Sequence, residues 1–481
     1  MKAILFLFLS FTILNSFAQD LSKLQSEVKK ISSESVLVHG QLGISIRDTQ
    51  GKIVYQHQGD KSLIPASNLK IISTATALGI LGEDFRYQTK LEYDGAISGG
   101  ILNGNIYVSG SGDPTLGSSR FKDFPDMDML TNLFCDKIMA AGIKKINGRL
   151  IADETGFDKN ALPEHWMWTD IGNYYGAPAC GLNFNENLYK LYFMPGSKQG
   201  DSTSILRTEP FIPGLTFINS VKTGSPGSGD NAYIYGAPYS YQRFITGTIP
   251  PGSTEFSIKG SAPDPAHMLL YTLAQKLIGR GVEVSLPQPQ LQTPGYSSER
   301  KNIYTQNSVS LKEIAKATNG SSINLYAEAL LKTTGFKIKK NGSTKSGIRA
   351  VREYWSKKGL DTAGFFMNDG SGLSATNAIQ ANTFTQLLYL VGKESYAASF
   401  YESLPVCGVS GTMKNIGKGT AAEGRVAAKT GTINKVICYT GYVTIRNGQR
   451  YSFSILANNF DCSNSEIIRK LTRIMVLMAE L

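Results

Sequence analysis

The sequence predicts an α+β fold: an antiparallel sheet built from both ends of the chain, helices that flank it, a helical subdomain, and a large, mainly β insertion. Strand-like alternation of apolar residues occurs at 41–60 and again at 436–458. Helical spacing dominates from about residue 312 to 390. Between these regions, residues 86–262 are rich in Gly, Ser and Tyr and in short alternating runs. This stretch is too long for a single connection, so we expect an insertion with domains of its own.

The composition is that of a folded protein. The chain has 481 residues, of which 41% are hydrophobic and 18% charged, which excludes disorder and a collagen-like structure. At about 150 residues per domain, this length predicts about three domains. The net charge of +11 is spread along the chain without a dense basic block. We therefore expect an ordinarily solvated surface and no nucleic-acid partner.

Residues 1–18 have the features of a secretory signal peptide. Lys2 precedes an apolar run that ends in Ser16-Phe17-Ala18, with small residues three and one before the expected cut. The run is too short to span a membrane, and no later stretch has spanning length, so no transmembrane anchor is expected after cleavage. The sequence thus predicts a protein that is soluble outside the cytoplasm.

A hairpin and a buried helix are the first elements expected after the signal peptide. Apolar residues alternate at 42–46 and 53–55, on either side of a turn. After Pro65, apolar residues recur at helical spacing, which predicts a helix with Ser67 in its first turn and an end near Gly79 and Gly82.

Two elements are expected at the C-terminus. Asn447-Gly448 joins two alternating runs and predicts a hairpin with a type I′ turn. The tail from Ser465 has the spacing of an amphipathic helix.

Metal, cofactor and histidine-based chemistry are not expected. The five cysteines are scattered without a Cys-x-x-Cys pair, and the four histidines lie far apart without His-Glu-x-x-His spacing. The cysteines leave room for one or two disulfides, whose pairing the sequence does not give.

Ser67 and Lys70 are the candidate nucleophile and base. Three residues apart at a helix start, they share one face, where an uncharged lysine can take the hydroxyl proton. Burial and a second cation nearby would favour the uncharged form. Ser26…Lys29 and Ser119…Lys122 have the same spacing, but only Ser67 opens an apolar helix. On spacing alone, the alternative is a helix-capping serine beside a surface lysine.

Two further motifs support this chemistry. Ser322-Ile323-Asn324 heads a helical run, where a hydroxyl could relay a proton and an amide could hold substrate. Lys429-Thr430-Gly431-Thr432 precedes the last hairpin on an expected edge strand, where glycine would admit a substrate backbone and the lysine and threonines would attract a carboxylate. Lys222-Thr223-Gly224 is rejected because it lies in a turn cluster and precedes the Ser-x-Asn element.

The chain carries three motifs in the order Ser-x-x-Lys, Ser-x-Asn and Lys-Thr-Gly. This ordered set resembles the signature of penicillin-binding proteins and serine β-lactamases. Ser67 and Ser322 are 255 residues apart. This long insertion resembles the D-alanyl-D-alanine carboxypeptidase/endopeptidase family, the class C low-molecular-mass penicillin-binding proteins, in which the insert forms two extra domains. The resemblance extends over nearly the whole mature chain. It implies a penicillin-binding/β-lactamase-like transpeptidase domain in two parts, 19–85 and 263–481, with inserted domains at 86–262.

The resemblance also implies a role for each motif residue. Ser67 would be the acylated nucleophile, Lys70 its general base, and Ser322 the donor of a proton to the departing D-alanine. Asn324 would bond the substrate amide. Lys429 would keep Lys70 neutral and attract the C-terminal carboxylate of the substrate, aided by the threonines of its motif, Thr430 and Thr432. The backbone N–H groups of Ser67 and Thr432 would form the oxyanion hole.

Asp153 and Phe157 resemble insert residues that border a pocket for a diaminopimelate side chain. Family members that recognise this side chain commonly carry an arginine directly after Asp-Gly-Ser-Gly-Leu-Ser, where this chain has Ala375. Recognition of the diaminopimelate end is therefore left open.

We expect a periplasmic serine D-Ala-D-Ala carboxypeptidase that acts on peptidoglycan stem peptides and is inhibited covalently by β-lactams, and leave open whether it also cleaves cross-links. One alternative is a β-lactamase or esterase on the same scaffold, although no dedicated deacylating glutamate is identifiable between Ser322 and Lys429. The other is a catalytically silent wall-binding protein.

Overall fold

The computed structural model describes residues 2–289 and 299–481 and divides into two compact units. Unit 1 comprises Met1–Glu83, Ala315–Ile323 and Ile348–Leu481, and unit 2 comprises Asp84–Ile314 and Asn324–Gly347. Helices α6 (Leu311–Ser321) and α8 (Thr344–Lys357) pass from one unit into the other.

Unit 1 is built on a five-stranded antiparallel sheet formed by both ends of the chain. Its order is β19-β20-β21-β1-β2. These strands are β1 (Gln41–Arg47), β2 (Ile53–His57), β19 (Val426–Ile433), β20 (Val436–Thr444) and β21 (Arg450–Asn458). Ile44 of β1 lies opposite Ile455 of β21, which joins the two ends. The hairpins predicted at 41–60 and 436–458 are therefore confirmed.

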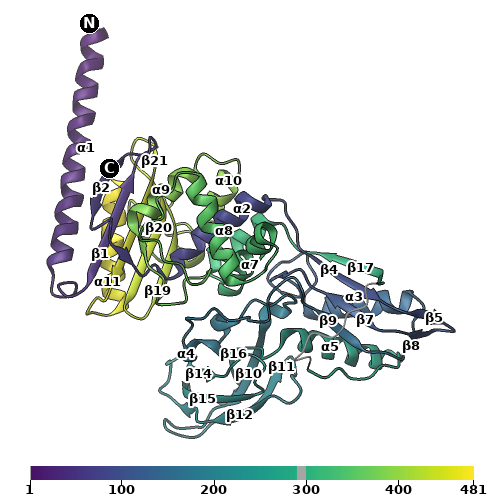
Figure 1. Ribbon diagram of the computed structural model, residues 1–481. Coiled ribbons are helices and arrows are strands. Elements are labelled where there is room, and N and C mark those ends of the chain that lie inside the picture. Colours follow the sequence, from purple (N-terminus) through teal and green to yellow (C-terminus); the bar gives the residue numbers. More distant parts are fainter. Residues whose placement is uncertain (1, 290–298) are drawn as a thin grey trace. The chain divides into compact units, whose positions relative to one another are not determined.

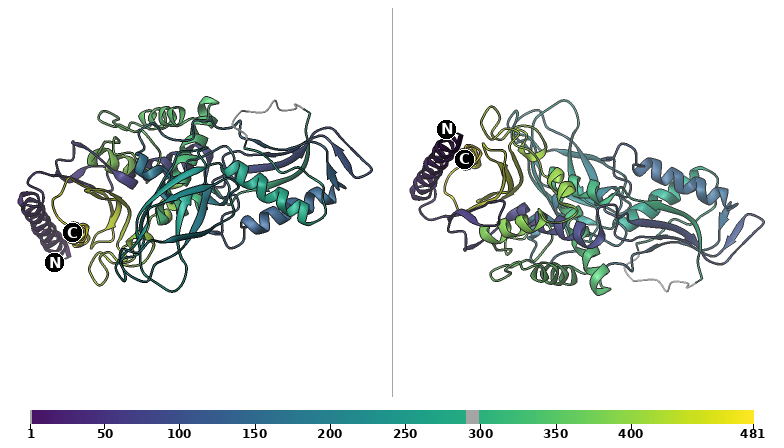
Figure 2. Two further views of the ribbon diagram at one scale, coloured as in Figure 1. Left: turned by 90° about the horizontal axis from the view of Figure 1, so that it is seen from below. Right: turned by 90° about the horizontal axis from the view of Figure 1, so that it is seen from above.

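Helices cover both faces of this sheet. α11 (Asn464–Ala479), with the C-terminal part of α1 (Lys2–Ser33), lies on one face, and α9 (Ala381–Val391) lies on the other (Figures 1 and 2). Ser45 of β1 bonds Thr385 of α9 at 2.9 Å. Because both faces are covered, β20 and β21 are buried along nearly their whole length, although their sequences alternate.

The remaining elements of unit 1 lie around the candidate nucleophile. They are the short strands β3 (Ser62–Leu63) and β18 (Ile379–Gln380), the 3-10 turns η1 (Ala66–Leu69) and η4 (Gly411–Met413), and helices α2 (Lys70–Leu81) and α10 (Ala397–Ser403). The predicted helix is confirmed, and it ends at Gly82 with a φ of 87°. Its first turn is a 3-10 turn, so Ser67 precedes the α-helix proper.

Unit 2 is mainly β in its described part, as predicted for the insertion. Its strands form four small sheets: β17-β4-β7-β9, β11-β10-β16, β12-β15-β13 with β14 on β15, and β5-β6-β8. The strands are β4 (Gln88–Tyr93), β5 (Ala96–Ser98), β6 (Ile101–Asn103), β7 (Ile106–Ser109), β8 (Lys145–Ile146), β9 (Leu150–Asp153), β10 (Leu188–Met194), β11 (Ser204–Glu209), β12 (Thr216–Asn219), β13 (Lys222–Thr223), β14 (Asn231–Tyr235), β15 (Gln242–Ile249), β16 (Phe256–Ser261) and β17 (Lys301–Asn307). The helical elements are α3 (Met127–Ala140), α4 (Trp168–Ile171), η2 (Tyr174–Gly176), η3 (Asn185–Asn187), α5 (Pro265–Gly279) and α7 (Asn324–Lys339).

Unit 2 is longer than the predicted insertion, 86–262. α5 packs on α3 and β9, and β17 pairs with β4, so the chain beyond residue 262 shares the core of the insertion. These contacts are made in the fold and cannot be recognised from local composition.

The last hairpin has a different turn from the one predicted. A type I′ turn needs positive φ at both central residues. Gly448 has a φ of 84°, but Asn447 does not have a positive φ. The Gly448 N–H donates to the Ile445 carbonyl at 3.0 Å. This is the arrangement of a type I turn followed by one left-handed residue, so the type I′ prediction was wrong.

All five cysteines are free thiols, so no disulfide forms. Among the described residues, no helix has the combined length and apolarity needed to cross a bilayer. Cleavage after Ala18 stays a prediction.

Packing of the terminal helix can be tested with one buried and one exposed residue. Met475 of α11 is fully buried against the sheet, whereas Arg469 is exposed. We predict that Met475→Ala lowers the free energy of unfolding by about 2–5 kcal/mol, because it leaves a cavity. Arg469→Ala should change it by no more than about 0.5 kcal/mol. Thermal unfolding of both variants measures the difference, and equal melting temperatures would contradict this packing.

Candidate active site

Ser67 lies in the turn η1, directly before α2. Lys70 begins α2 and is fully buried. Its Nζ lies 2.9 Å from Ser67 Oγ and donates to the Ser371 carbonyl at 2.7 Å. The amine is therefore held within reach of the hydroxyl by a partner about 300 residues away in sequence. This geometry is the one expected for a nucleophile and its base.

A tight loop at 369–374 holds the Lys70 partner in place. The buried Asp369 carboxylate accepts the N–H groups of Gly372 at 2.8 Å and Ser374 at 2.7 Å. Gly372 has a φ of 81°, and a Cβ on it would lie 1.8 Å from the Ala66 carbonyl oxygen. The loop therefore packs directly on the turn that carries Ser67. Sequence reasoning did not find the contacts of this loop with Lys70 and the Ser67 turn, because they are made by backbone atoms.

Ser322 and Lys429 form a second serine–lysine pair in unit 1. Ser322 follows α6 with a φ of 59°. Lys429, on β19, is fully buried, and its Nζ donates to Ser322 Oγ at 2.9 Å and to the Thr430 carbonyl at 2.7 Å. Ser322 and Lys429, which are 107 residues apart in the sequence, are therefore in direct contact.

The two buried amines repel each other. Burial lowers the pKa of Lys429 well below its usual value of 10.5, and the charge of Lys70 lowers it further. The sequence predicted that the charge of Lys429 keeps Lys70 neutral, and the structure shows that burial and Lys70 also disfavour protonation of Lys429. Because the repulsion is mutual, release of one proton from the pair relieves it.

β19 is the edge strand of the sheet, as predicted. The Ala428 N–H donates to Pro405 on the side away from β20. Since backbone groups alternate along a strand, the Thr432 N–H faces this same side, where it can serve in an oxyanion hole. Thr430 Oγ1 donates to Thr412 at 2.9 Å.

Gly431 packs closely against the Ser67 turn, and its expected role in admitting a substrate backbone stays a prediction. A Cβ on it would lie 2.6 Å from the Pro65 carbonyl oxygen and 3.0 Å from Asn68 Oδ1. Glycine is therefore needed here so that β19 can pass close to the Ser67 turn. Asn68 in turn donates to Thr440 Oγ1 of β20 at 2.7 Å, which ties that turn to the sheet. Sequence reasoning missed Asn68, because an asparagine beside a motif gives no signal of such a distant partner.

Asn324 belongs to unit 2, where it begins α7. It is buried, and its Nδ2 donates to the Tyr175 carbonyl at 2.7 Å. This bond fixes the side-chain amide, and its role toward a substrate stays a prediction.

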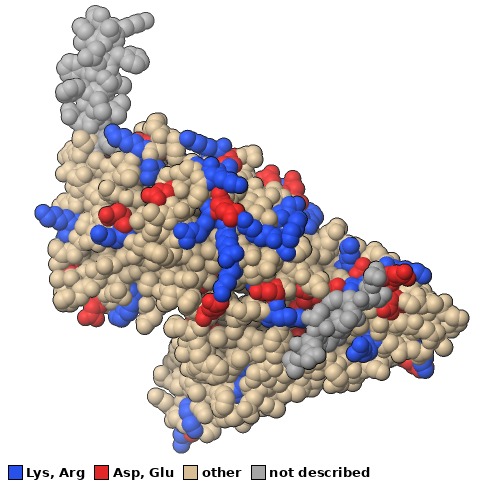
Figure 3. Space-filling view, viewed as in Figure 1, with Lys and Arg blue, Asp and Glu red and all other residues tan. Residues whose placement is uncertain are grey.

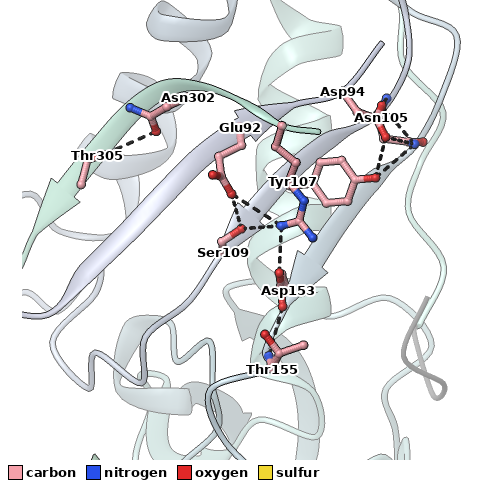
Figure 4. Close-up of polar contacts among 10 residues, drawn as sticks. Glu92, Asp94, Asn105, Tyr107, Ser109, Asp153, Thr155, Asn302 and Thr305 are labelled. Carbon is pink, nitrogen blue, oxygen red and sulfur yellow. Dashed lines mark hydrogen bonds and ion pairs between the residues drawn. The ribbon is translucent and has the colours of Figure 1, made fainter. Parts of the chain in front are cut away.

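Asp153 and Phe157 also belong to unit 2. Asp153, on β9, accepts a bond of 2.8 Å from Arg300, which lies 3.5 Å from Glu92 and over the ring of Tyr107 (Figure 4). The Asp153 carboxylate is thus already paired with a cation. Phe157 is buried, and Lys332 Nζ lies 5.7 Å from its ring centre. The pocket role of both residues remains a prediction.

The α+β architecture and the two serine–lysine pairs are those of the active-site-serine enzymes that include penicillin-binding proteins and serine β-lactamases. The chain belongs to the D-Ala-D-Ala carboxypeptidase 3 (S13) family, whose model matches residues 24–480. It is therefore a serine peptidase, and the expected family is confirmed.

Known relatives match most of the chain. A D-alanyl-D-alanine carboxypeptidase of Actinomadura sp. (strain R39) is 30% identical over 91% of this chain and 81% of the relative. The D-alanyl-D-alanine carboxypeptidase DacB of Haemophilus influenzae is 24% identical over 87% and 85%. The crystal structure of penicillin binding protein 4 from H. influenzae aligns with a TM-score of 0.79 at 21% identity, covering 96% of this chain and 99% of that one. This structural likeness confirms the expected fold.

The loop at 369–374 gives a prediction with a matched control. Gly372 and Gly359 both have positive φ, but a Cβ on Gly359 meets open space. Gly372→Ala should slow acylation by a fluorescent penicillin about 10²-fold, because it displaces the Ser67 turn. Gly359→Ala carries the same backbone strain and should retain labelling. Equal labelling rates in the two variants would show that the loop does not position Ser67.

Lys429 gives a prediction about stability and pH. Lys429→Met replaces a buried amine, whose charged form is disfavoured there, with an apolar side chain, so it should leave the protein at least as stable as wild type while slowing acylation about 10²–10³-fold. Because the pKa of Lys429 is lowered in the folded state, the unfolded state binds more protons, and the stability of wild type relative to the variant should rise between about pH 7 and pH 10. Denaturant unfolding over this range tests the sign, and a falling difference would contradict it.

Proposed function

We propose that the chain removes the terminal D-alanine from peptidoglycan stem peptides through an acyl-enzyme on Ser67. The observation that carries this proposal is the 2.9 Å contact between Lys70 Nζ and Ser67 Oγ inside a buried site that also holds Lys429. The family supplies the reaction class, and this contact supplies its nucleophile.

Acylation follows from the positions of the two pairs. The uncharged Lys70 takes the Ser67 proton as Oγ attacks the carbonyl carbon of the penultimate D-alanine. The Ser67 and Thr432 N–H groups stabilise the oxyanion. When the C–N bond breaks, Ser322 passes its proton to the leaving amine and regains one from the lysine pair, to which it is bonded through Lys429. The pair thereby gives up the proton that it took from Ser67, and Lys70 is uncharged again. In the second step Lys70 takes a proton from the water that attacks the ester, and it returns this proton to Ser67 Oγ as the acyl–oxygen bond breaks.

The substrate carboxylate is proposed to lie at the edge of β19. Lys429 contributes positive charge there when protonated, and the hydroxyls of Thr430 and Thr432 offer hydrogen-bond donors. Asn324 is proposed to bond the substrate amide. A β-lactam carries a carboxylate and a strained amide, so the same groups would direct it to acylate Ser67.

We also propose that the protein is exported and cut after Ala18. Two facts support this: residues 1–18 have the pattern of a signal peptide, and the family match begins at residue 24. The proposed substrate also lies outside the cytoplasm. N-terminal sequencing of the protein recovered from the periplasm tests the cut, and an intact Met1 there would contradict it.

The nucleophile is tested by two serine variants with the same Ser-x-x-Lys spacing. Ser67→Ala should reduce labelling by a fluorescent penicillin, and D-alanine release from a pentapeptide, by at least about 10³-fold. Ser119→Ala is the matched control, because Ser119 precedes Lys122 but is exposed in unit 2. It should behave as wild type. Equal labelling of Ser67→Ala would remove Ser67 from the mechanism.

Product analysis separates the remaining alternatives. We expect digestion of monomeric muropeptides to yield products lighter by one D-alanine, and digestion of cross-linked dimers to show whether cross-links are cut as well. Rapid turnover of a β-lactam without a lasting adduct would instead support a β-lactamase. Wall binding without any product would support a silent binding protein.

A further inference from the structure

One face of a sheet in unit 2 exposes apolar side chains in a continuous row. Ile218 of β12 lies opposite Phe244 of β15, and Phe244 lies opposite Tyr235 of β14. The ring of Trp168, on α4, is 6.0 Å from that of Tyr235. We call these four residues the apolar row. With about 4.8 Å between paired strands, it spans roughly 15 Å.

The apolar row is solvent-exposed. Trp168 is 53% exposed, Ile218 and Phe244 are exposed to a similar degree, and Tyr235 is half-buried. The opposite face of the sheet carries the buried core residues, such as Ile245. Folding thus buries one face of the sheet and leaves the row in water, which is typical of a binding surface.

The surroundings of the row are polar but uncharged. Along β12, β14 and β15, the other side chains in register with this face are Thr216, Gln242, Thr246, Tyr233, Thr248 and Asn231. None is charged, although the chain has a net charge of +11. Lys222 of β13 lies opposite Thr248, at the far end of the sheet. Figure 3 shows only a few charged side chains over the part of unit 2 that is labelled β14, β15 and β12 in Figure 1, several of them at its lower tip.

The lack of charged side chains on this face indicates which class of polymer can bind to it. A surface for nucleic acid or another anionic polymer needs a cluster of cations, which these strands lack. Flat apolar rings flanked by hydroxyls and amides match a neutral sugar ring, which has an apolar C–H face and hydrogen-bonding groups at its edge.

The row is also linked to a residue proposed to bind substrate. Asn324 donates to the Tyr175 carbonyl, and the Tyr175 hydroxyl bonds the Asp170 carboxylate of α4. α4 begins with Trp168, the first ring of the row. All of these residues belong to unit 2, so the row continues from the Asn324 environment.

From this continuity and chemistry we propose that the apolar row binds the glycan strand that carries the stem peptides. The proposal rests on the proposed function, because it assumes a peptidoglycan substrate. Sugar rings stacked along the row would raise the local concentration of stem peptides near the enzyme. The row is thus a binding site for the polymer, separate from the groups that bind the peptide.

Binding at the apolar row can be measured directly through the fluorescence of Trp168. Of the three tryptophans, Trp166 and Trp355 are buried, so a change in fluorescence on binding reports chiefly on Trp168. The probe is a soluble, uncharged oligomer of β-1,4-linked N-acetylglucosamine, because a glycan strand freed of its peptides would carry a lactyl carboxylate on every second sugar. We expect saturable quenching in wild type and about tenfold weaker binding in Phe244→Ala, corresponding to about 1.4 kcal/mol. Phe211→Ala is the matched control, because Phe211 is 65% exposed but outside the row, and it should bind as wild type.

A second measurement separates this proposal from the catalytic one. Phe244→Ala should release D-alanine from a soluble pentapeptide at the wild-type rate but more slowly from intact sacculi. Absence of quenching in wild type, or equal weakening in Phe211→Ala, would overturn the proposal. A dimer seen by sedimentation that Phe244→Ala disrupts would instead assign the row to a second copy of the chain. If Ser67→Ala remains active, the catalytic proposal fails, while glycan binding is still measured on its own.

Discussion

Two cationic side chains buried in one site are the constraint on which the rest of the active site depends. Lys70 and Lys429 are both fully buried, and the charge of one lowers the pKa of the other. Keeping two ammonium groups together out of water is costly, so the pair favours losing a proton. The amine that results is the base that a serine hydroxyl needs near neutral pH. The repulsion therefore lowers stability and enables catalysis.

The surrounding fold holds these two amines against their repulsion. Lys70 is held through α2 and the Ser371 carbonyl, and Lys429 through an edge strand and Ser322. Close backbone contacts fix both sides of the site, because Gly372 and Gly431 each leave no room for a Cβ. Ala66 also adopts a positive φ of 46°, which costs of order 1–3 kcal/mol for a non-glycine residue. Such strain persists because the sheet and the loop at 369–374 together impose it.

The sequence was informative where function depends on side chains at short spacing. Ser67 and Lys70 are one helical turn apart, so a local pattern identified them, and motif order then brought in Lys429. The supporting residues left no such pattern: Ser371 acts through a carbonyl, and Asn68 bonds a residue 372 positions away. The pairing of β17 with β4 left no local pattern either, because it arises only in the folded chain.

The most direct test of this account is the pH dependence of single-turnover acylation by a β-lactam in wild type and Lys429→Met. With its cationic neighbour removed, the base should keep its proton to a higher pH. The account therefore predicts that the rising limb of the rate profile moves to higher pH in the variant, whatever its absolute rate. If the rising limb of the rate profile lies at the same pH in Lys429→Met as in wild type, or at a lower pH, then Lys429 does not set the protonation of the base.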